Sequence, residues 1–342
     1  MSNSGNILSI SPPHAIPGGE ITIECSAYHV SRDGGHGCTI GGDLCRIVAA
    51  SRRRVIAIAP SVVGTGEADV YLESNGGRSE PFPIVIGEKL IDDMHIVANP
   101  AIDPKDDSLV VTRSGSRGES LANTLYRLEA DGYVDELPAS VMNPTGIAFN
   151  KEGRMFVTNR SDGWVVEVDR GEEAITFAAG LGVATGIAFD RDDVLYVGDR
   201  SGTIYRVPEP GFIETFAVLE PSVSAYHIAF GPDERLYVTA PGLTSNDAVH
   251  VIDRDGGVST YFRGLGRPQG LAFDGDGNLY VAACYKGKHG VVRLSPGAEK
   301  AEIFVAGMNV VGICFTRAGD MIVATGHSAF SLPLGIYGTL LD

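Results

Sequence analysis

The sequence predicts an all-β protein in two parts, a small sandwich followed by a ring of repeated β-sheets. Three observations carry this prediction. The 342 residues include 44 glycines and 18 prolines, and helix-like spacing of apolar residues is scarce. From about residue 88 onward, one hairpin-like pattern recurs along the chain. The residues before it lack the repeat and form short runs in which apolar and polar side chains alternate.

The repeat is clearest from Gly270 to Val281, where Gly-Leu-Ala-Phe, a Gly-rich turn and Leu-Tyr-Val follow one another. Five copies are spaced 40, 41, 43 and 42 residues apart, and in each a Val follows the Phe by eight residues. A period of about 40 to 45 residues with four short strands is typical of a β-propeller blade. The repeated phenylalanines are predicted to lie buried between blades: Phe149, Phe189, Phe230, Phe273 and Phe315.

A weaker copy begins at Ile102 with one extra residue in its turn, which brings the predicted blade count to six. The last copy, from Val311, lacks a clear fourth strand. Residues 88–94 match the fourth strands of other copies, so we expect them to pair into the last blade and close the ring. The alternative is that residues 337–341 supply that strand alone.

Residues 7–86 contain about seven predicted strands, which indicates a small sandwich. Its spaced motifs include Ile10-Ser11-Pro12, Pro17-Gly18-Gly19, Ile40-Gly41-Gly42 and Ser79-Glu80-Pro81-Phe82. In this order they resemble the IPT/TIG immunoglobulin-like domain. The resemblance implies a spacer or docking module in residues 1–87, followed by a six-bladed propeller in residues 88–342.

The propeller part resembles the NHL and SMP-30/gluconolactonase-like six-bladed families. The residues that carry the resemblance are Gly186-Ile187-Ala188-Phe189 and Leu195-Tyr196-Val197-Gly198-Asp199-Arg200. This resemblance implies the fold, but the fold hosts many chemistries, so function has to be argued from the site.

Composition excludes several classes of function. The net charge of −16 repels phosphate backbones, so we expect no nucleic-acid partner. No run of 18 apolar residues and no signal peptide are visible, so we expect no membrane partner and a cytoplasmic protein, or an extracellular one if a leader was trimmed. Five cysteines argue against a disulfide framework; a Cys25–Cys38 or Cys38–Cys45 bridge is left open.

The mouth of the central channel is the predicted functional site. In the gluconolactonase-like enzymes, Glu, Asn and Asp hold a divalent cation, in Pro-Asn-Gly and Pro-Asp-Gly contexts. Here those contexts read Pro144-Thr145-Gly146 and Pro268-Gln269-Gly270, without the acidic ligands. Because a hard cation needs several oxygens and negative charge, we predict no metal site and no cofactor. A divalent cation remains only as an alternative.

An Arg-Ser pair recurs in three consecutive blades, at Arg113, Arg160 and Arg200. We interpret these arginines as lying at matching positions, where guanidinium groups would clamp a carboxylate or phosphate. The alternative is that each arginine forms a salt bridge with an aspartate, such as Asp162 or Asp199, and holds neighbouring blades together.

Tyr226-His227 interrupts the repeat where other copies carry a Gly, and we expect both side chains at the mouth; a packed, hydrogen-bonded histidine is the alternative. Asp199 and His227 are the candidate catalytic acid/base pair. The candidate ligand-binding residues are Arg113, Thr145, Asn159, Arg160, Thr185, Arg200, Tyr226 and Gln269.

Two functional hypotheses follow. The first is a binding module whose mouth recognises a small polar or anionic molecule or a peptide, with the IPT/TIG-like part as a docking domain. The second is a lactonase-like hydrolase or sugar-modifying enzyme that uses Asp199, His227, Asn159 and the arginines. The missing acidic metal ligands favour the first hypothesis.

Overall fold

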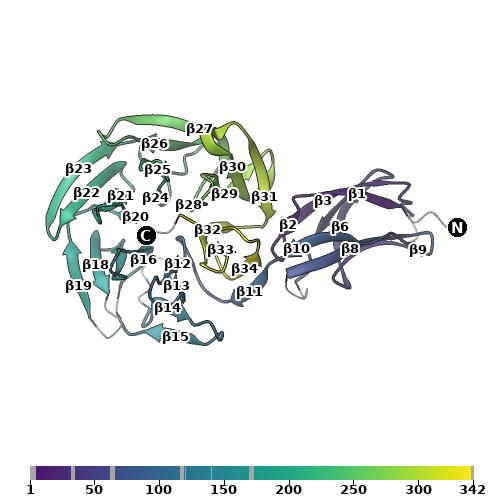
Figure 1. Ribbon diagram of the computed structural model, residues 1–342, viewed down its shortest axis with the longest axis horizontal. Helices are drawn as coiled ribbons and strands as arrows, with labels where there is room; N and C mark the ends of the chain where they lie inside the picture. Colours follow the sequence, from purple (N-terminus) through teal and green to yellow (C-terminus); the bar gives the residue numbers. More distant parts are fainter. Residues whose placement is uncertain are drawn as a thin grey trace.

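A computed structural model of the chain describes residues 5–31, 35–61, 66–115, 119, 121–139, 141–168 and 173–339. Within these residues the fold is all-β, with a sandwich of two sheets beside a ring of six blades (Figure 1). The helical content of this part of the chain is one 3-10 turn, η1 (Pro296–Ala298). None of its helices is long and apolar enough to cross a membrane.

The sandwich packs two sheets around one aliphatic core. The first sheet has the order β1-β3-β7-β6, and the second has the order β2-β10-β8-β4-β5 with β9 beside β8. The strands are β1 (Asn6–Ser11), β2 (His14–Ala15), β3 (Glu20–Ser26), β4 (His36–Ile40), β5 (Asp43–Leu44), β6 (Arg46–Ala50), β7 (Arg54–Ile58), β8 (Gly66–Ser74), β9 (Gly77–Arg78) and β10 (Phe82–Ile86).

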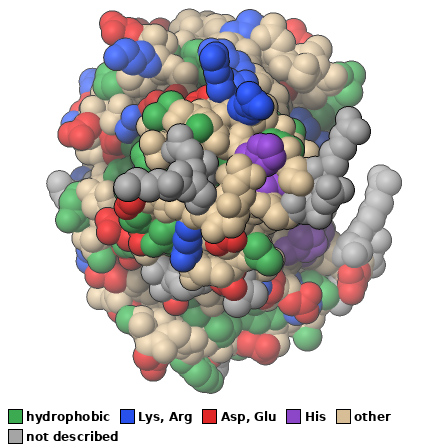
Figure 2. Space-filling view, turned by 90° about the vertical axis from the view of Figure 1, so that its right-hand side faces the viewer, with side chains coloured by type: hydrophobic (Ala, Val, Ile, Leu, Met, Phe, Trp, Pro, Cys, Tyr) green, Lys and Arg blue, Asp and Glu red, His purple; other side chains and the backbone are tan. Residues whose placement is uncertain are grey.

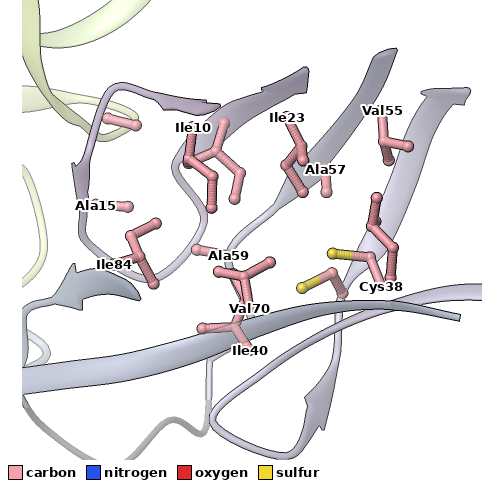
Figure 3. Close-up of a cluster of buried hydrophobic side chains, with 14 of the residues drawn as sticks. Ile10, Ala15, Ile23, Cys38, Ile40, Val55, Ala57, Ala59, Val70 and Ile84 are labelled. Carbon is pink, nitrogen blue, oxygen red and sulfur yellow. The ribbon is translucent and has the colours of Figure 1, made fainter. Parts of the chain in front are cut away.

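The core between these sheets follows from the alternation in the sequence. In β3 every second residue is buried, as expected for a strand with one face on a core. Figure 3 shows Ile23 and Val55 on one sheet facing Ile40 and Val70 on the other. The outer surface of this end of the molecule mixes acidic, basic and apolar side chains without one dominant charge (Figure 2).

The cysteines of the sandwich, Cys25, Cys38 and Cys45, are buried, and all five cysteines of the chain are free thiols in this structure. Cys38 and Cys45 face each other across the β4–β5 hairpin, where the Cys45 N–H donates to the Cys38 carbonyl at 2.9 Å. Burial raises the pKa of the Cys25 thiol, so this thiol stays protonated and unreactive at neutral pH.

The sandwich is joined to the ring by hydrogen-bonded strands. β2 pairs in parallel with β10 on one side and with β31 (Ala301–Ala306) of the ring on the other, so one sheet continues across the junction. The ring of His14 lies 4.5 Å from that of Phe304. Ile16, just after β2, is fully buried in a hydrophobic cluster of the ring that includes Val305.

Each blade has an inner, a second, a third and an outer strand. Blade I consists of β12 (Ala101–Ile102), β13 (Leu109–Thr112), β14 (Leu125–Leu128) and β15 (Val134–Leu137). Blade II consists of β16 (Pro144–Phe149), β17 (Met155–Asn159), β18 (Trp164–Val168) and β19 (Ala174–Ala178). Blade III consists of β20 (Ala184–Phe189), β21 (Leu195–Asp199), β22 (Thr203–Glu209) and β23 (Phe212–Val218). In Figure 1 the inner strands lie nearest the ring centre.

Blades IV and V are β24 (His227–Phe230), β25 (Leu236–Thr239), β26 (Asp247–Ile252), β27 (Val258–Gly266); and β28 (Leu271–Phe273), β29 (Leu279–Tyr285), β30 (Lys288–Leu294) and β31. Blade VI consists of β32 (Val310–Phe315), β33 (Asp320–Thr325), β34 (Ala329–Pro333) and, as its outer strand, β11 (Glu88–Ile91).

The closure of the ring confirms the sequence-based prediction. β11 pairs antiparallel with β34, with Glu88 opposite Ser331 and Lys89 opposite Phe330. The C-terminal tail, residues 335–339, does not take the outer position, because Gly338 forms a bridge with Asp274 of blade V instead. The fourth strand of the last blade therefore comes from the start of the propeller.

The blades pack through a repeated aromatic arrangement. In four interfaces, an aromatic ring from the second strand lies edge-on between a ring of its own outer strand and the repeat Phe of the next blade. Ring centroids are 4.7 to 5.3 Å apart. These aromatic triads are Phe177–Phe156–Phe189, Phe216–Tyr196–Phe230, Tyr261–Tyr237–Phe273 and Phe304–Tyr280–Phe315. Of the five repeat phenylalanines, three are buried as predicted, whereas Phe149 and Phe230 are only half-buried.

Candidate functional site

The two ends of the ring carry different parts of each blade. Because successive strands of a blade are antiparallel, its two hairpin turns lie at one end, and the second-to-third connection and the link to the next blade lie at the other. We call the latter the upper end. The C-terminal tail runs along the lower end, where the Gly275 N–H donates to Tyr337 O at 2.8 Å and the Thr339 N–H to Phe273 O at 3.1 Å.

Six equivalent positions on the inner strands surround the ring axis. The strand register, extended from the paired residues, places them at Asn99, Gly146, Gly186, His227, Gly270 and Gly312. The inner strands come too close for side chains at most of these positions, because a Cβ on Gly146 would lie 2.5 Å from Thr185 O. The two positions that carry side chains belong to blades I and IV, which are three blades apart in a ring of six.

Asn99 ties three blades together at the axis. Its Nδ2 donates to Leu271 O at 3.0 Å, and its Oδ1 accepts the Ile313 N–H at 3.0 Å. A Cβ on Gly270 would lie 2.0 Å from Asn99 Oδ1, so the amide fills the space that this glycine leaves. Asn99 therefore has a structural role, joining blade I to blades V and VI.

His227 lines a small axial cavity of about 30 Å³, together with Asn99, Thr145 and Thr185. Its imidazole is buried, and its Nε2 has no hydrogen-bond partner within the described chain. Burial lowers the pKa of His227 to about 4, so the imidazole is neutral at pH 7. A cavity of this size holds about one water molecule, so the axis itself does not admit a sugar lactone.

No hydrogen bond joins Asp199 and His227, the predicted acid/base pair, in the described chain. The Asp199 carboxylate is buried and accepts the Val183 N–H at 2.8 Å and the Ser201 hydroxyl. Burial is the cause of the lowered pKa of His227, with no contribution from a carboxylate. Asp199 thus connects two segments of blade III. Through Val183 it binds the segment before β20, and through Ser201 it binds the turn after β21.

The candidate ligand-binding threonines join neighbouring blades. The Thr145 hydroxyl donates to Ala184 O at 3.0 Å. The Thr185 hydroxyl donates to Gly198 O at 3.1 Å and accepts the Tyr226 N–H at 2.9 Å. Both threonines line the axial cavity, but their hydroxyls are already satisfied by the protein.

Tyr226 and Asn159 are also engaged within the fold. Tyr226 is fully buried, its hydroxyl donates to Glu220 O, and burial raises its pKa to about 12. The sequence placed this ring at the mouth, but the glycine at position 198 leaves space for it between blades III and IV. The Asn159 side-chain carbonyl accepts the Ser161 N–H at 3.1 Å and shapes the turn after β17.

The strand register corrects the match between the three arginines. The N–H groups of Ser114, Arg160 and Arg200 each donate to a carbonyl of the preceding inter-blade link, so these three residues are equivalent. Arg113 lies one residue earlier, and its guanidinium is 3.4 Å from the Tyr126 hydroxyl. A shift of one residue in a strand turns the side chain to the other face, so Arg113 does not share the position of the other two.

Arg160 and Arg200 form a cationic pair at the upper end. The Arg200 guanidinium donates to Ser222 O at 3.2 Å and to Val223 O at 3.0 Å. The Arg160 guanidinium is half-buried and has neither a hydrogen bond nor an ion pair with any described residue. Its pKa is lowered, first by burial and then by the positive charge of Arg200. Neither arginine forms the predicted salt bridge in the described part of the chain.

Exposed apolar side chains, which were not among the residues predicted from the sequence, lie around this arginine pair. Arg200 N–H donates to Val183 O, and its guanidinium donates to Val223 O. Val223 N–H in turn donates to Pro241 O at 3.1 Å, two residues before Leu243, whose side chain is 93% exposed. We call Met142, Val183, Val223 and Leu243 the apolar arc. Met142 precedes the predicted mouth residue Thr145 by three residues, and Val223 precedes the predicted mouth residue Tyr226 by three. This shared spacing could have indicated the apolar arc from the sequence.

The remaining predicted residue, Gln269, is half-buried at the start of blade V. Its backbone N–H donates to Ala282 O at 2.8 Å, and its carbonyl accepts the Thr239 hydroxyl. The Gln269 amide group has no partner among the described residues. Over that same part of the chain, no group of three or more His, Cys, Asp or Glu side chains is arranged to hold a metal ion.

Comparisons with known proteins agree with the propeller architecture. No protein-family model matches the chain. It is 30% identical over 198 residues to lactonase drp35 of Staphylococcus saprophyticus; the match covers 50% of this chain and 60% of that protein. The chain thus spans less than two thirds of this curated relative.

Two solved structures are similar at lower identity. A gluconolactonase from Xanthomonas campestris has a TM-score of 0.58 and 18% identity, over 71% of this chain and 88% of that one. An auxiliary nutrient binding protein from Bacteroides ovatus has a TM-score of 0.56 and 12% identity, over 96% of this chain and 97% of that one. The chain is therefore a β-propeller protein with gluconolactonase-like structural neighbours, and these identities establish the fold alone.

Proposed function

We propose that the chain is a binding module whose upper end docks an acidic segment of a partner protein or peptide. The observation that carries the proposal is the half-buried Arg160 guanidinium, which lies beside Arg200 and has no carboxylate partner in the described chain. The positive charge of the exposed Arg200 repels the half-buried Arg160 guanidinium. In a chain of net charge −16, such a pair is best explained by an anionic ligand that compensates it.

The size of the axial cavity and the apolar arc favour a peptide over a small molecule. The cavity of about 30 Å³ is far below the several hundred Å³ of ordinary small-molecule sites. Exposed apolar side chains grouped with arginines are typical of protein–protein contact surfaces. A segment that combines acidic and apolar residues would complement both features of the upper end.

The sandwich fits the role of a second docking module in this proposal. We propose that residues 1–87 form an IPT/TIG-like domain and that residues 88–342 form the propeller. Two sheets around a single aliphatic core, with strand patterns of immunoglobulin-like type, support this assignment.

Selection from a phage-displayed library of random 12-residue peptides tests the upper-end proposal. Enriched peptides should be rich in Asp, Glu and apolar residues. Arg160→Ala and Arg200→Ala should each weaken binding of a synthetic enriched peptide about tenfold, since a charge-assisted hydrogen bond contributes roughly 1.5–3 kcal/mol. Arg113→Ala is the matched control and should leave the affinity unchanged. Enrichment without acidic residues, or equal affinity for all variants, would contradict the proposal.

Similarity to lactonase drp35 supports a second candidate, a lactonase-like hydrolase. In that reaction water adds to the lactone carbonyl and the ring C–O bond breaks, which gives a hydroxy acid. This candidate keeps Asp199 and His227 as the proposed catalytic residues, with Asn159 and the arginines near the substrate, although no hydrogen bond joins Asp199 to His227 in the described chain. Hydrolysis of five- and six-membered lactones, measured with and without Ca²⁺ or Mg²⁺, tests whether the chain is a hydrolase. Turnover that Asp199→Asn abolishes would establish the hydrolase, and its absence would exclude it.

A further inference from the structure

A second cavity lies at the lower end, away from the predicted mouth. It is a groove of about 770 Å³ between blades III and IV. Its walls are the hairpin turn of blade III around Arg191 and the two hairpin turns of blade IV around Glu234 and Arg254, and Thr339 of the tail lines it as well. This volume is in the range of ordinary small-molecule sites.

The floor of the groove is one of the four aromatic triads. Phe216 and Phe230 flank Tyr196, with ring centroids 5.0 and 5.1 Å from that of the tyrosine. In the other three triads the repeat Phe is at most 5% exposed. Phe230 and Phe216 are instead half-buried, and both line the groove. This triad therefore presents aromatic surface to a cavity.

The arginines in the groove form ion pairs with glutamates. Arg191 and Arg254 both form ion pairs with Glu234. Arg206 forms an ion pair with Glu214 at 2.8 Å. Two carboxylates of the protein thus face these three guanidiniums and compensate two of the three charges.

The acidic groups of the groove outnumber its remaining cations. Asp192 and Asp255, on the turns of blades III and IV, have no side-chain partner in the described chain. Asp190 and Asp253 accept only hydrogen bonds from nearby backbone N–H groups, and from the Tyr196 hydroxyl in the case of Asp190. Lys151 is the one lining cation without a carboxylate partner among the described residues. The groove therefore combines aromatic surface with an excess of negative charge.

We propose that this groove binds an organic cation, an amine or quaternary ammonium compound that carries apolar substituents. The faces of Phe216, Phe230 and Tyr196 attract a cation through their π-electrons, and this attraction grows when the cation is desolvated. The apolar substituents would cover the rings, and the unpaired carboxylates would face the positive charge. The site is independent of the docking surface at the upper end.

Isothermal titration calorimetry with three probes of similar shape tests the charge preference. The probes are benzyltrimethylammonium, neutral benzyl alcohol and anionic phenylacetate. The cation should bind about tenfold more tightly than either of the others. Equal affinity for the three probes, or no heat of binding with the cation at millimolar concentration, would overturn the proposal.

Two sets of variants test the location. Phe216→Ala should weaken binding of benzyltrimethylammonium about fivefold or more. Phe177→Ala, at the same repeat position of blade II but outside the groove, should leave it unchanged. The double variant Asp192→Asn/Asp255→Asn changes only exposed turns, so it keeps the fold while lowering the affinity. Unchanged cation affinity in both Phe216→Ala and the double variant would place the cation elsewhere and overturn the proposal.

Discussion

The interface between blades V and VI and the interface between blades III and IV share one aromatic plan but differ in what covers it. Between blades V and VI, the tail lies over the triad, because a Cβ on Gly338 would be 3.0 Å from the Cβ of Phe315. Between blades III and IV, Thr339 of the tail lines the groove, and Phe230 beside it is only half-buried. The repeat thus fixes where the rings lie, but the exposure of the repeat Phe differs from one interface to another.

The largest difference between the two interfaces is expected when their equivalent phenylalanines are removed. Phe315→Ala removes a buried ring and should lower the free energy of unfolding by about 3–5 kcal/mol. Phe230→Ala removes a half-buried ring and should cost less, roughly 1–3 kcal/mol. Urea denaturation of the two variants measures both values. Equal losses would mean that the two interfaces are equally sealed.

The pH dependence of stability also distinguishes the two regions, because blade IV carries His227 at the axis where blades V and VI carry glycine. The pKa of His227 is about 4 in the folded state and 6.5 when unfolded. The unfolded chain therefore binds the proton more tightly, and stability is full above pH ~6.5 and falls as the pH drops toward 4. The loss attributable to this group should be about 3 kcal/mol.

The control for this prediction is His227→Gln. Burial also lowers the pKa values of His14 and His250, so wild-type stability contains their contributions with the same sign. The difference between wild type and His227→Gln, followed by urea denaturation from pH 7 to pH 4, isolates the axial imidazole. A difference that does not change with pH would show that folding does not lower the pKa of His227.

The cover over blades V and VI can be tested at Gly338. A larger residue there, as in Gly338→Leu, would collide with Phe315 and displace the tail. Stability should fall by about 1–3 kcal/mol, as for other overpacked sites. Urea denaturation measures the loss, and unchanged stability would show that Gly338 does not pack against Phe315.

The smallest effect on stability is expected for Arg160→Ala. Because Arg160 has no partner in the described chain and lies beside Arg200, its removal should change the free energy of unfolding by less than about 0.5 kcal/mol. Thermal denaturation measures this change. A loss of several degrees in Tm would indicate that the arginine stabilises the fold and would weaken its assignment to ligand binding.

Much of the fold could be predicted because the repeat encodes it. The period located the inner strands, and the resemblance of residues 88–94 to outer strands predicted the pairing of β11 with β34. The extra turn residue in the first copy hid the true register of Arg113, since the equivalence shows only in the backbone hydrogen bonds. A sequence pattern shows which residues recur from blade to blade. It does not show whether a residue at the end of a strand is displaced by one position from its counterparts.

The candidate site was less predictable. The side chain of Tyr226 was expected at the mouth, but its burial depends on the space left by Gly198 of the neighbouring blade. The groove could not be predicted, because it depends on how the turns of blades III and IV and Thr339 of the tail come together in three dimensions. The cationic pair of Arg160 and Arg200 was proposed from the repeat itself, and its lack of carboxylate partners is a property of the three-dimensional arrangement.

The continuous sheet through β2 has a mechanical consequence. β2 is hydrogen-bonded on both sides, to β10 of the sandwich and β31 of the ring, and Ile16 anchors the adjoining turn in the core of the ring. A force that pulls the sandwich away from the propeller must shear this parallel pairing and extract a fully buried side chain at the same time. We therefore expect the sandwich to keep a fixed position relative to the ring. A molecule bound to the sandwich would then be held at a constant distance and orientation from the axis of the ring.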